Sequence, residues 1–280
     1  MEYFSAVGSV WILNFGGGVF CFEKFAVLSF YVFSSVMRIV QKILLCLICL
    51  SFLSSCTPQN KDESAAKSDK KQLIARLNDS VFCISIIIKG RDYEKRFSVG
   101  TGFLIGEGLL ASAAHVQTKA EEMLGKFKDP TAKIIAWKKF KTGESIEFPI
   151  EVAVSDKDND LAIYRFDSKV HQENPKFSAI KPLALAENLP PLGEEVVSIG
   201  YYGAYEFPFN SLGNVSMIDI NEDIFSDLTL MPGNSGAPVC DLETGKVLGV
   251  TTDVLDLGNE TVRYGIAKRA MKLRELLQKL

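Results

Sequence analysis

The pattern of apolar and polar residues divides the chain into three regions. Residues 1–55 are largely apolar, residues 56–71 are polar without periodicity, and short apolar runs punctuated by Gly, Pro, Asn and Asp follow from residue 72 to the end. A polar stretch without periodicity is typical of a flexible linker, whereas short apolar runs between turn residues are typical of β-strands. We therefore expect one folded region, residues 72–280, preceded by a flexible tether and an N-terminal leader.

The folded region reads as two β-rich halves that follow a short helix-like stretch at residues 72–77. Expected strands are residues 81–88, 96–105, 133–140, 145–154 and 161–166 in the first half (about 72–170), and 195–200, 213–220, 237–240, 246–252 and 261–267 in the second (about 181–267). A proline-containing connector separates the halves, and residues 268–280 carry four leucines at helical spacing, which predicts a C-terminal helix packed on a barrel. Many short strands without alternating long helices predict an all-β protein rather than a parallel α/β sheet.

Residues 37–55 have the order of an export signal: a positively charged start, an apolar run at 43–53, and small residues that lead to Cys56. The sequence Leu-Ser-Ser-Cys at its end resembles the lipobox of bacterial lipoproteins, in which the chain is cut before the cysteine and lipid is attached to its sulfur. This resemblance implies a lipid-anchored protein of the bacterial cell envelope, with its folded region in the periplasm or outside the cell. Because Thr57 rather than Asp follows the cysteine, the outer membrane is expected in a Gram-negative cell. The alternative is an ordinary secretory signal in which Cys56 is incidental.

Residues 1–36 precede this signal and are rich in Phe, Gly and Val. We favour Met37 as the true start, with residues 1–36 as an artefact of an upstream start. The alternative, an apolar extension with a second membrane helix, is weakened by three consecutive glycines at 16–18.

Composition excludes several classes of function. The net charge of −3 is spread along the chain, and its short Lys-rich stretch lies in the tether, which argues against nucleic acid as a partner. After residue 57 the chain has only two cysteines, Cys83 and Cys240, and no Cys-x-x-Cys pair with a histidine, so neither a metal nor another cofactor is expected. These two cysteines could form a disulfide, but we favour two buried strand thiols.

Three short segments carry the residues of a nucleophilic site: His115, Asp160 before an expected strand, and Ser235 between two glycines. A serine hydroxyl needs a neighbouring base, and the base needs a third group to orient it. Gly233 allows a tight turn in which its own N–H and that of Ser235 point at one spot and form an oxyanion hole. Each segment alone has a simpler explanation: Ser235 could lie in an ordinary turn, Asp160 could be a strand-edge carboxylate, and His115 could be a surface histidine. We infer that the other histidine, His171, is a solvated surface residue. Together, in the order His, Asp, Ser, the three segments favour catalysis.

These segments resemble the motifs of trypsin-like peptidases, especially bacterial Deg/HtrA-type proteases. The matching motifs are Ala-Ser-Ala-Ala-His-Val around His115, Asp-Leu-Ala-Ile-Tyr-Arg-Phe from Asp160, and Pro-Gly-Asn-Ser-Gly-Ala-Pro-Val around Ser235. The resemblance covers about residues 73–280. It implies two antiparallel six-stranded β-barrels of chymotrypsin type with a C-terminal helix, and a serine endopeptidase that acts on proteins or peptides through an acyl-enzyme. Because the sequence ends soon after the second half, no PDZ domain is expected.

The resemblance also assigns a specificity pocket. Its base lies six residues before the nucleophile, at Thr229, and Thr251 and Asp253 follow on the next strand. Because Thr229 carries no charge, a trypsin-like preference for Arg or Lys is not expected, and small or medium apolar residues are. Asp253 either narrows the pocket, attracts a basic side chain, or is an exposed turn residue, which we favour. Asn234 stands where mammalian relatives have Asp, so no activating N-terminal cut is expected.

Two other functions remain as alternatives. A catalytically silent protease-fold lipoprotein could act as a binding module, although such a protein would not need all three groups. An esterase or acyltransferase of the α/β-hydrolase fold is disfavoured, because its nucleophile precedes the histidine and lies in a Gly-x-Ser-x-Gly motif, which Ser235 lacks.

Overall fold

The structure is a computed structural model that describes residues 5–7, 10–15, 18–23, 60–127, 129–203, 205–256 and 263–280. The chain forms two units, Met1–Ala65 and Ala66–Leu280. In the first, β1 (Ser5–Val7), β2 (Val10–Phe15) and β3 (Gly18–Glu23) form an antiparallel sheet within the segment considered as an apolar extension. The export signal and Cys56 lie outside the described residues. Within the described part, no helix is both long and apolar enough to span a bilayer.

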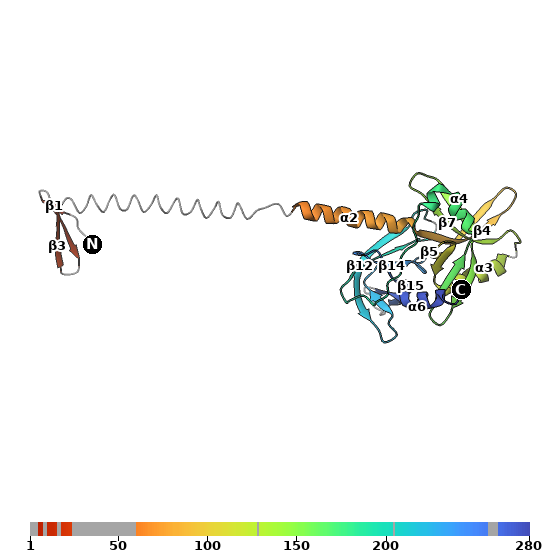
Figure 1. Cartoon of the computed structure of the whole chain (residues 1–280). Helices are drawn as coiled ribbons and strands as arrows, with labels where there is room; N and C mark the ends of the chain where they lie inside the picture. Colours follow the sequence, from red (N-terminus) through yellow and green to blue (C-terminus); the bar gives the residue numbers. More distant parts are fainter. Residues whose placement is uncertain are drawn as a thin grey trace. The chain divides into compact units, whose positions relative to one another are not determined.

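Helix α2 (Asn60–Asp79) begins inside the segment expected to be a flexible tether and continues through the short helix expected at residues 72–77 (Figure 1). Its sequence contains four Lys, three Ala and two Leu, which have high helix propensity. Leu77 is fully buried and packs the last turn into the hydrophobic core. Because an anchored turn removes the cost of nucleation, helix-forming residues upstream can extend it. The structure therefore replaces the tether expected at residues 60–71 with a helix.

The first half of the second unit is a seven-stranded antiparallel sheet in the order β8-β7-β4-β5-β6-β10-β9. Its strands are β4 (Val81–Lys89), β5 (Glu94–Gly106), β6 (Leu109–Ser112), β7 (Lys133–Lys139), β8 (Ser145–Pro149), β9 (Glu151–Asp156) and β10 (Leu161–Arg165). The segment expected as one strand at 145–154 is divided at Ile150 between the two edges of the sheet. Pro149, which has no N–H for a continuing ladder, ends β8 there. This division explains why the sheet has seven strands where a six-stranded barrel was expected, and it brings the two edges together at one residue.

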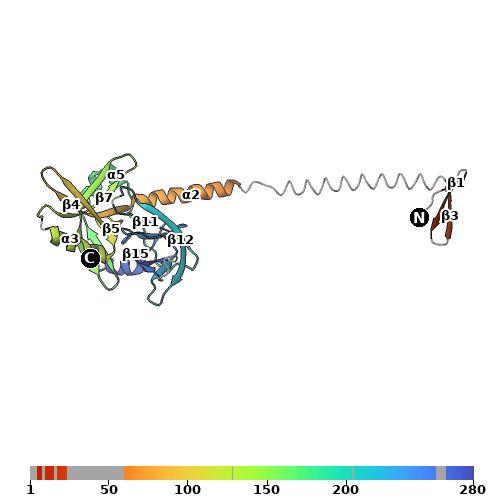
Figure 2. The same ribbon diagram turned by 180° about the vertical axis from the view of Figure 1, so that it is seen from behind.

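The second half is a closed six-stranded antiparallel barrel in the order β11-β12-β13-β16-β15-β14, followed by helix α6 (Ala270–Leu277). Its strands are β11 (Glu195–Gly200), β12 (Phe209–Ile218), β13 (Ile224–Ser226), β14 (Pro238–Asp241), β15 (Val247–Asp256) and β16 (Arg263–Arg269). The all-β class, a closed six-stranded barrel and the C-terminal helix are thereby confirmed. Three helices were not expected from the sequence: α3 (Ala114–Phe127), α4 (Ser168–Glu173) and α5 (Pro175–Ser178). In Figure 2, β4 and β5 of the sheet lie beside β11 of the barrel.

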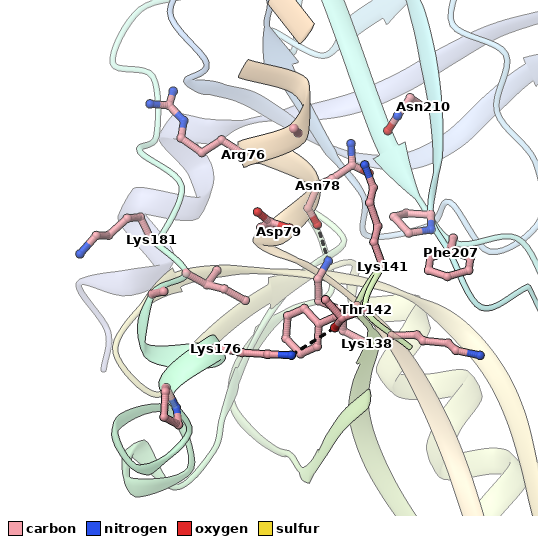
Figure 3. Close-up of a pocket in the computed structure, with 17 residues that line it drawn as sticks. Arg76, Asn78, Asp79, Lys138, Lys141, Thr142, Lys176, Lys181, Phe207 and Asn210 are labelled. Atoms are coloured by element: carbon pink, nitrogen blue, oxygen red, sulfur yellow. Dashed lines mark hydrogen bonds between the residues drawn. The ribbon is translucent and has the colours of Figure 1, made fainter. Parts of the chain in front are cut away.

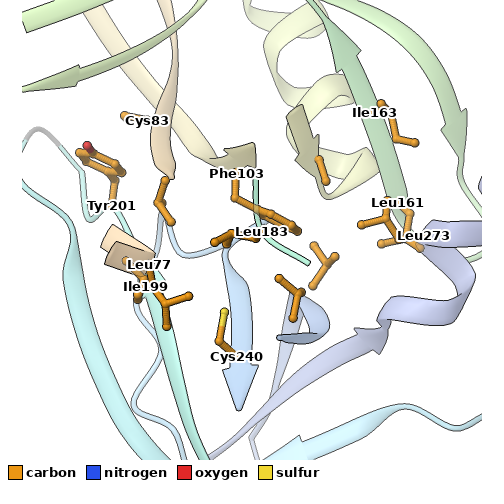
Figure 4. Close-up of a cluster of buried hydrophobic side chains, with 14 of the residues drawn as sticks. Leu77, Cys83, Phe103, Leu161, Ile163, Leu183, Ile199, Tyr201, Cys240 and Leu273 are labelled. Atoms are coloured by element: carbon orange, nitrogen blue, oxygen red, sulfur yellow. The ribbon is translucent and has the colours of Figure 1, made fainter. Parts of the chain in front are cut away.

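Strand β4 lies between two hydrophobic clusters because its side chains alternate between its faces. Phe82, Ile84 and Ile86 face the cluster inside the first half. Val81 and Cys83 face a second cluster, which also contains residues of the barrel. Figure 4 shows this shared cluster, where Leu77, Cys83 and Phe103 of the first half lie near Ile199 and Cys240 of the barrel and Leu273 of α6. The two halves therefore share one hydrophobic core.

The two cysteines of this shared cluster are free thiols, and both are buried. Burial raises the pKa of the Cys83 thiol and that of the Cys240 thiol. The structure thus agrees with two buried strand thiols rather than with the alternative disulfide.

Lys138 belongs to β7 and lies beside the last turn of α2. It is a buried cation, only 4% exposed. Its Nζ donates hydrogen bonds to the carbonyl oxygens of Asn78 at 2.6 Å and Val81 at 3.4 Å (Figure 3). Burial lowers its pKa from 10.5 to about 8. It lines a cavity of about 970 Å³, which contains none of the candidate site residues.

The stability contribution of Lys138 should therefore depend on pH. Between pH 8 and 10.5 the unfolded chain keeps the lysine proton that the folded protein has released, so the free energy of unfolding rises with pH, by ~3 kcal/mol at most. Urea unfolding of the wild type and of Lys138→Met should show the wild type gaining stability relative to the variant across this range. Lys119→Met, at an exposed position of α3, is the control and should leave the pH dependence unchanged. Parallel curves for wild type and Lys138→Met would contradict the prediction.

Candidate active site

His115 and Asp160 form a hydrogen-bonded pair at the start of α3. His115 lies in the first turn of the helix, and its Nδ1 is 2.7 Å from Asp160 Oδ2. The other carboxylate oxygen, Oδ1, accepts the backbone N–H of His115 at 2.8 Å, and the Asp160 carbonyl accepts the N–H of Ala114 at 3.1 Å. A carboxylate at a helix N-terminus is favoured by the helix dipole. With Nδ1–H donating to the carboxylate, Nε2 is the acceptor that faces away from Asp160.

The turn before β10 sets the position of Asp160. Asp160 has a φ of +49°, in the left-handed region, which Asp tolerates better than most residues. Asp156 stabilises this turn, because its Oδ1 accepts the N–H groups of Asp158 at 3.1 Å and Asn159 at 3.0 Å. The side chain of Asn159 also donates to Asp156 Oδ2 at 2.9 Å, and these bonds hold the pKa of Asp156 below its ordinary value. Asp156 was not expected from the sequence as part of the site, although the spacing Asp-x-x-Asn is a turn signal.

The turn that carries Ser235 packs against the segment before His115. Gly236 has a φ of +83°, and a Cβ there would lie 2.1 Å from Ser112 Oγ, so only glycine allows this close approach. On the other side, a Cβ on Gly100 would lie 3.0 Å from the Ser235 carbonyl oxygen and 2.5 Å from the Val116 side chain. Gly100 thus separates Ser235 from the residue that follows His115. The structure brings all three expected catalytic residues to one place between the halves.

The N–H groups of the turn fall into two sets. Those of Asn234, Gly236 and Ala237 donate to backbone carbonyls at 2.9, 2.7 and 2.8 Å. Within the described residues, the N–H groups of Gly233 and Ser235 donate to no other group. They are the two donors that the sequence assigned to an oxyanion hole, and both remain available. Among the described residues, the ring of His115 forms a hydrogen bond with Asp160 and none with Ser235. A long or missing bond between base and nucleophile is common in unliganded active sites.

Two hollows lie beside Ser235 and His115 and share lining residues of β15. One, of about 340 Å³, is lined by Ser235 and Thr251, and the other, of about 520 Å³, by His115 and Asp160. Thr252 and Asp253 line both hollows. Ser235 lies in the lining of one hollow and His115 in that of the other, and the two hollows together are called the cleft.

The specificity residues expected from the sequence are only partly brought together. Thr251 and Asp253 line the hollow beside Ser235, whereas Thr229 is exposed and is not among the described residues that line it. Leu230 and Met231 line it instead. Asp253 belongs to β15 rather than to a turn, although its side chain is exposed.

Comparison with known proteins gives similarities over the same part of the chain. A family model described as a trypsin-like peptidase domain matches residues 100–250, which include His115, Asp160 and Ser235. A DegP-like periplasmic serine endoprotease of Halomonas elongata is 26% identical over 179 residues, which are 58% of this chain and 30% of that protein. The Do-like 13 protease of Arabidopsis thaliana is 28% identical over 206 residues, 70% of this chain and 38% of that protein. The chain therefore spans about a third of the length of these curated relatives.

Solved structures give the same result for the fold. A serine endoprotease from Yersinia pestis aligns with a TM-score of 0.54 and 17% identity, over 75% of this chain and 65% of that one. The structure of Deg5 aligns with a TM-score of 0.54 and 19% identity, over 78% of this chain and 95% of that one. At these identities the likeness concerns the fold alone.

Proposed function

The chain belongs to the family of trypsin-like peptidases, and from this membership we propose that it is an active serine endopeptidase with Ser235 as nucleophile, His115 as general base and Asp160 as orienting carboxylate. The observation that carries the proposal is the His115–Asp160 pair, in which Nδ1 and Oδ2 are 2.7 Å apart and Nε2 is left as a base toward the side of Ser235. The two free N–H groups of the Ser235 turn complete the arrangement.

In the proposed reaction, Nε2 of His115 takes the proton of the Ser235 hydroxyl while Oγ attacks the carbonyl carbon of the scissile peptide bond. The carbonyl oxygen becomes an oxyanion held by the N–H groups of Gly233 and Ser235. Asp160 stabilises the imidazolium that forms, which then gives its proton to the leaving amine. Water, activated by the same imidazole, hydrolyses the acyl-enzyme and releases the serine.

Covalent labelling tests this function directly. The full chain should react with a fluorophosphonate probe, because such probes modify serines activated by a neighbouring base, and the modified peptide should contain Ser235. The same chain should hydrolyse casein. Heat-unfolded protein is the control and should not be labelled. A native protein that is unlabelled, or labelled at another residue, would contradict the assignment.

Asp253 supports a proposal about substrates. Its exposed carboxylate lines both hollows. Thr251, which lines the hollow beside Ser235, is uncharged. We therefore propose that the preferred substrates are peptides with an apolar residue at the cleaved bond and a basic residue nearby. In matched fluorogenic peptides with Lys, Gln or Glu scanned around the cleaved bond, Lys should raise kcat/KM over Glu by about tenfold at one position. Asp253→Asn should remove most of this difference, whereas Glu243→Gln, an exposed acid outside the cleft, should not. Equal rates for Lys and Glu peptides at every position would refute the proposal.

The cell envelope and a lipid anchor at Cys56 are also part of the proposed function. They are supported by the order of charge, apolar run and cysteine in residues 37–56, and by the periplasmic relative from Halomonas elongata. Labelled palmitate should be incorporated by the wild type and not by Cys56→Ser. Incorporation by both would exclude this anchor.

A further inference from the structure

Thr101, in β5, joins the two halves of the protein directly behind the candidate nucleophile, and it is fully buried. Its Oγ1 donates a hydrogen bond to the carbonyl oxygen of Gly233 at 2.7 Å and accepts the N–H of Tyr201 at 2.9 Å. Its backbone N–H donates to the Ser235 carbonyl at 2.8 Å, and its own carbonyl accepts the Ser112 hydroxyl at 2.6 Å. One residue of the first half thus contacts both ends of the turn that carries the nucleophile.

The direction of the Thr101 hydroxyl proton follows from these partners. A hydroxyl has one proton to donate, and backbone N–H groups only donate. Because the bond with Tyr201 uses the N–H of Tyr201, the oxygen of Thr101 is the acceptor there, and its own proton is free for the Gly233 carbonyl. The distance of 2.7 Å is typical of a well-formed O–H···O bond.

The bonded carbonyl belongs to the peptide unit that links the two candidate oxyanion donors. This unit consists of the Gly233 carbonyl and the Asn234 N–H, and it lies between the N–H groups of Gly233 and Ser235. The Asn234 N–H donates to the Met231 carbonyl at 2.9 Å, so the unit is held from both sides, by Thr101 and by Met231. Gly233 has a φ of +107° and no Cβ to restrict rotation, so these bonds define the plane of the unit.

We propose that the Thr101 hydroxyl is a positioning group that keeps the Gly233 and Ser235 N–H groups convergent on the developing oxyanion. This inference rests on the proposed peptidase function. Donors stabilise a transition state to the extent that they are aligned before the reaction, and rotation of the linking peptide would turn them apart. Thr101 touches no substrate, so its loss acts on the transition state rather than on substrate binding.

The test compares Thr101→Val, which keeps the shape and removes only the hydroxyl, with Thr101→Ser, which keeps the hydroxyl. In the full chain, kcat for a peptide substrate should fall by about 10- to 100-fold in Thr101→Val, with KM changed by less than about threefold. Thr101→Ser should retain most of the wild-type kcat. The matched control is Ser80→Ala: the Ser80 hydroxyl is equally buried and donates to the Lys181 carbonyl at the same 2.7 Å, on a part of the protein that does not line the cleft. Its loss should lower the melting temperature without lowering kcat.

A second measurement separates positioning from general damage to the fold. The affinity of a peptide aldehyde, whose hemiacetal oxygen mimics the oxyanion, should fall in Thr101→Val by about the same factor as kcat. An unchanged kcat in folded Thr101→Val, or an equal loss in Ser80→Ala, would overturn the positioning role. If Thr101→Val does not fold, Thr101→Cys, with its weak thiol donor, is measured instead and should show the same loss. A wild type without activity would overturn both this inference and the proposed function, whereas an active wild type with active Thr101→Val would overturn this inference alone.

Discussion

Ser235→Ala should abolish peptide hydrolysis by the full chain, with kcat reduced by about 10⁶-fold. The half-buried Ser235 side chain lines the cleft beside Thr251, and the close approach of Gly236 to Ser112 fixes the backbone around it. Removal of the hydroxyl takes away the atom that forms the acyl-enzyme but no part of this packing. The melting temperature should therefore stay within about two degrees of the wild type, since a change at a partly exposed serine costs little stability.

The control for this variant is Ser211→Ala, the same substitution at a half-buried serine of β12 that lines neither of the two hollows. It should leave kcat unchanged. Initial rates on a fluorogenic peptide and labelling by the fluorophosphonate probe should be lost together in Ser235→Ala and retained together in Ser211→Ala. Hydrolysis that persists in Ser235→Ala would show that Ser235 is not the nucleophile and would contradict the proposed triad.

The candidate catalytic residues could be proposed from the sequence because their signals are local. The glycines on both sides of Ser235 are read within four residues, and the continuous apolar run at 161–164 after Asp160 predicts the strand β10. The order His, Asp, Ser then disfavoured the α/β-hydrolase fold, in which the nucleophile precedes the histidine. Pairing of His115 with Asp160 is a long-range event, yet it could be inferred because the resemblance to peptidases supplies it.

Features that depend on contacts between distant segments could not be predicted. Thr101 reads as an ordinary strand residue, and only the packing of β5 against the Ser235 turn shows its bonds to Gly233 and Ser235. The expected role of Thr229 came from counting back six residues, which assumes that the turn has the same conformation in every relative. Here Leu230 and Met231 line the hollow and Thr229 is exposed. Sequence distance along a turn does not determine which side chain points into a cavity.

The helices were missed for a related reason. The first turn of α3 contains the motif around His115, which was read as a site and not as a helix start, although the Asp160 carboxylate acts as a partner for its N-terminal N–H. A capping group that comes from 45 residues further along the chain leaves no local signal. The extent of α2 likewise depends on the burial of Leu77 in a core that the rest of the chain builds.

The same contact between Asp160 and the start of α3 makes Asp160→Asn the second prediction with a large effect. Asp160 Oδ1 accepts the backbone N–H of His115, and Oδ2 faces Nδ1 of the ring. In the asparagine variant, the amide oxygen must take the place of Oδ1, because an amide NH₂ there would face another donor. The NH₂ group then faces Nδ1 and forces this nitrogen to accept. The ring proton moves to Nε2, which can no longer take the proton of Ser235.

We therefore expect Asp160→Asn to lower kcat by about 10⁴-fold with an intact fold, as a change of tautomer rather than a loss of structure. Proton NMR provides the direct measurement: the downfield Nδ1–H resonance of His115 at the carboxylate should disappear in Asp160→Asn and remain in Asp158→Asn. Asp158 lies in the same turn, is exposed, and tests the same change of charge without a bond to the ring. If both variants lost kcat equally, the effect would come from the charge of the cleft and not from the orientation of His115. A loss confined to Asp160→Asn would mean that the group facing Nδ1 determines the tautomer of His115. The backbone N–H of His115 selects that group, because it fixes which end of the residue-160 side chain faces the ring.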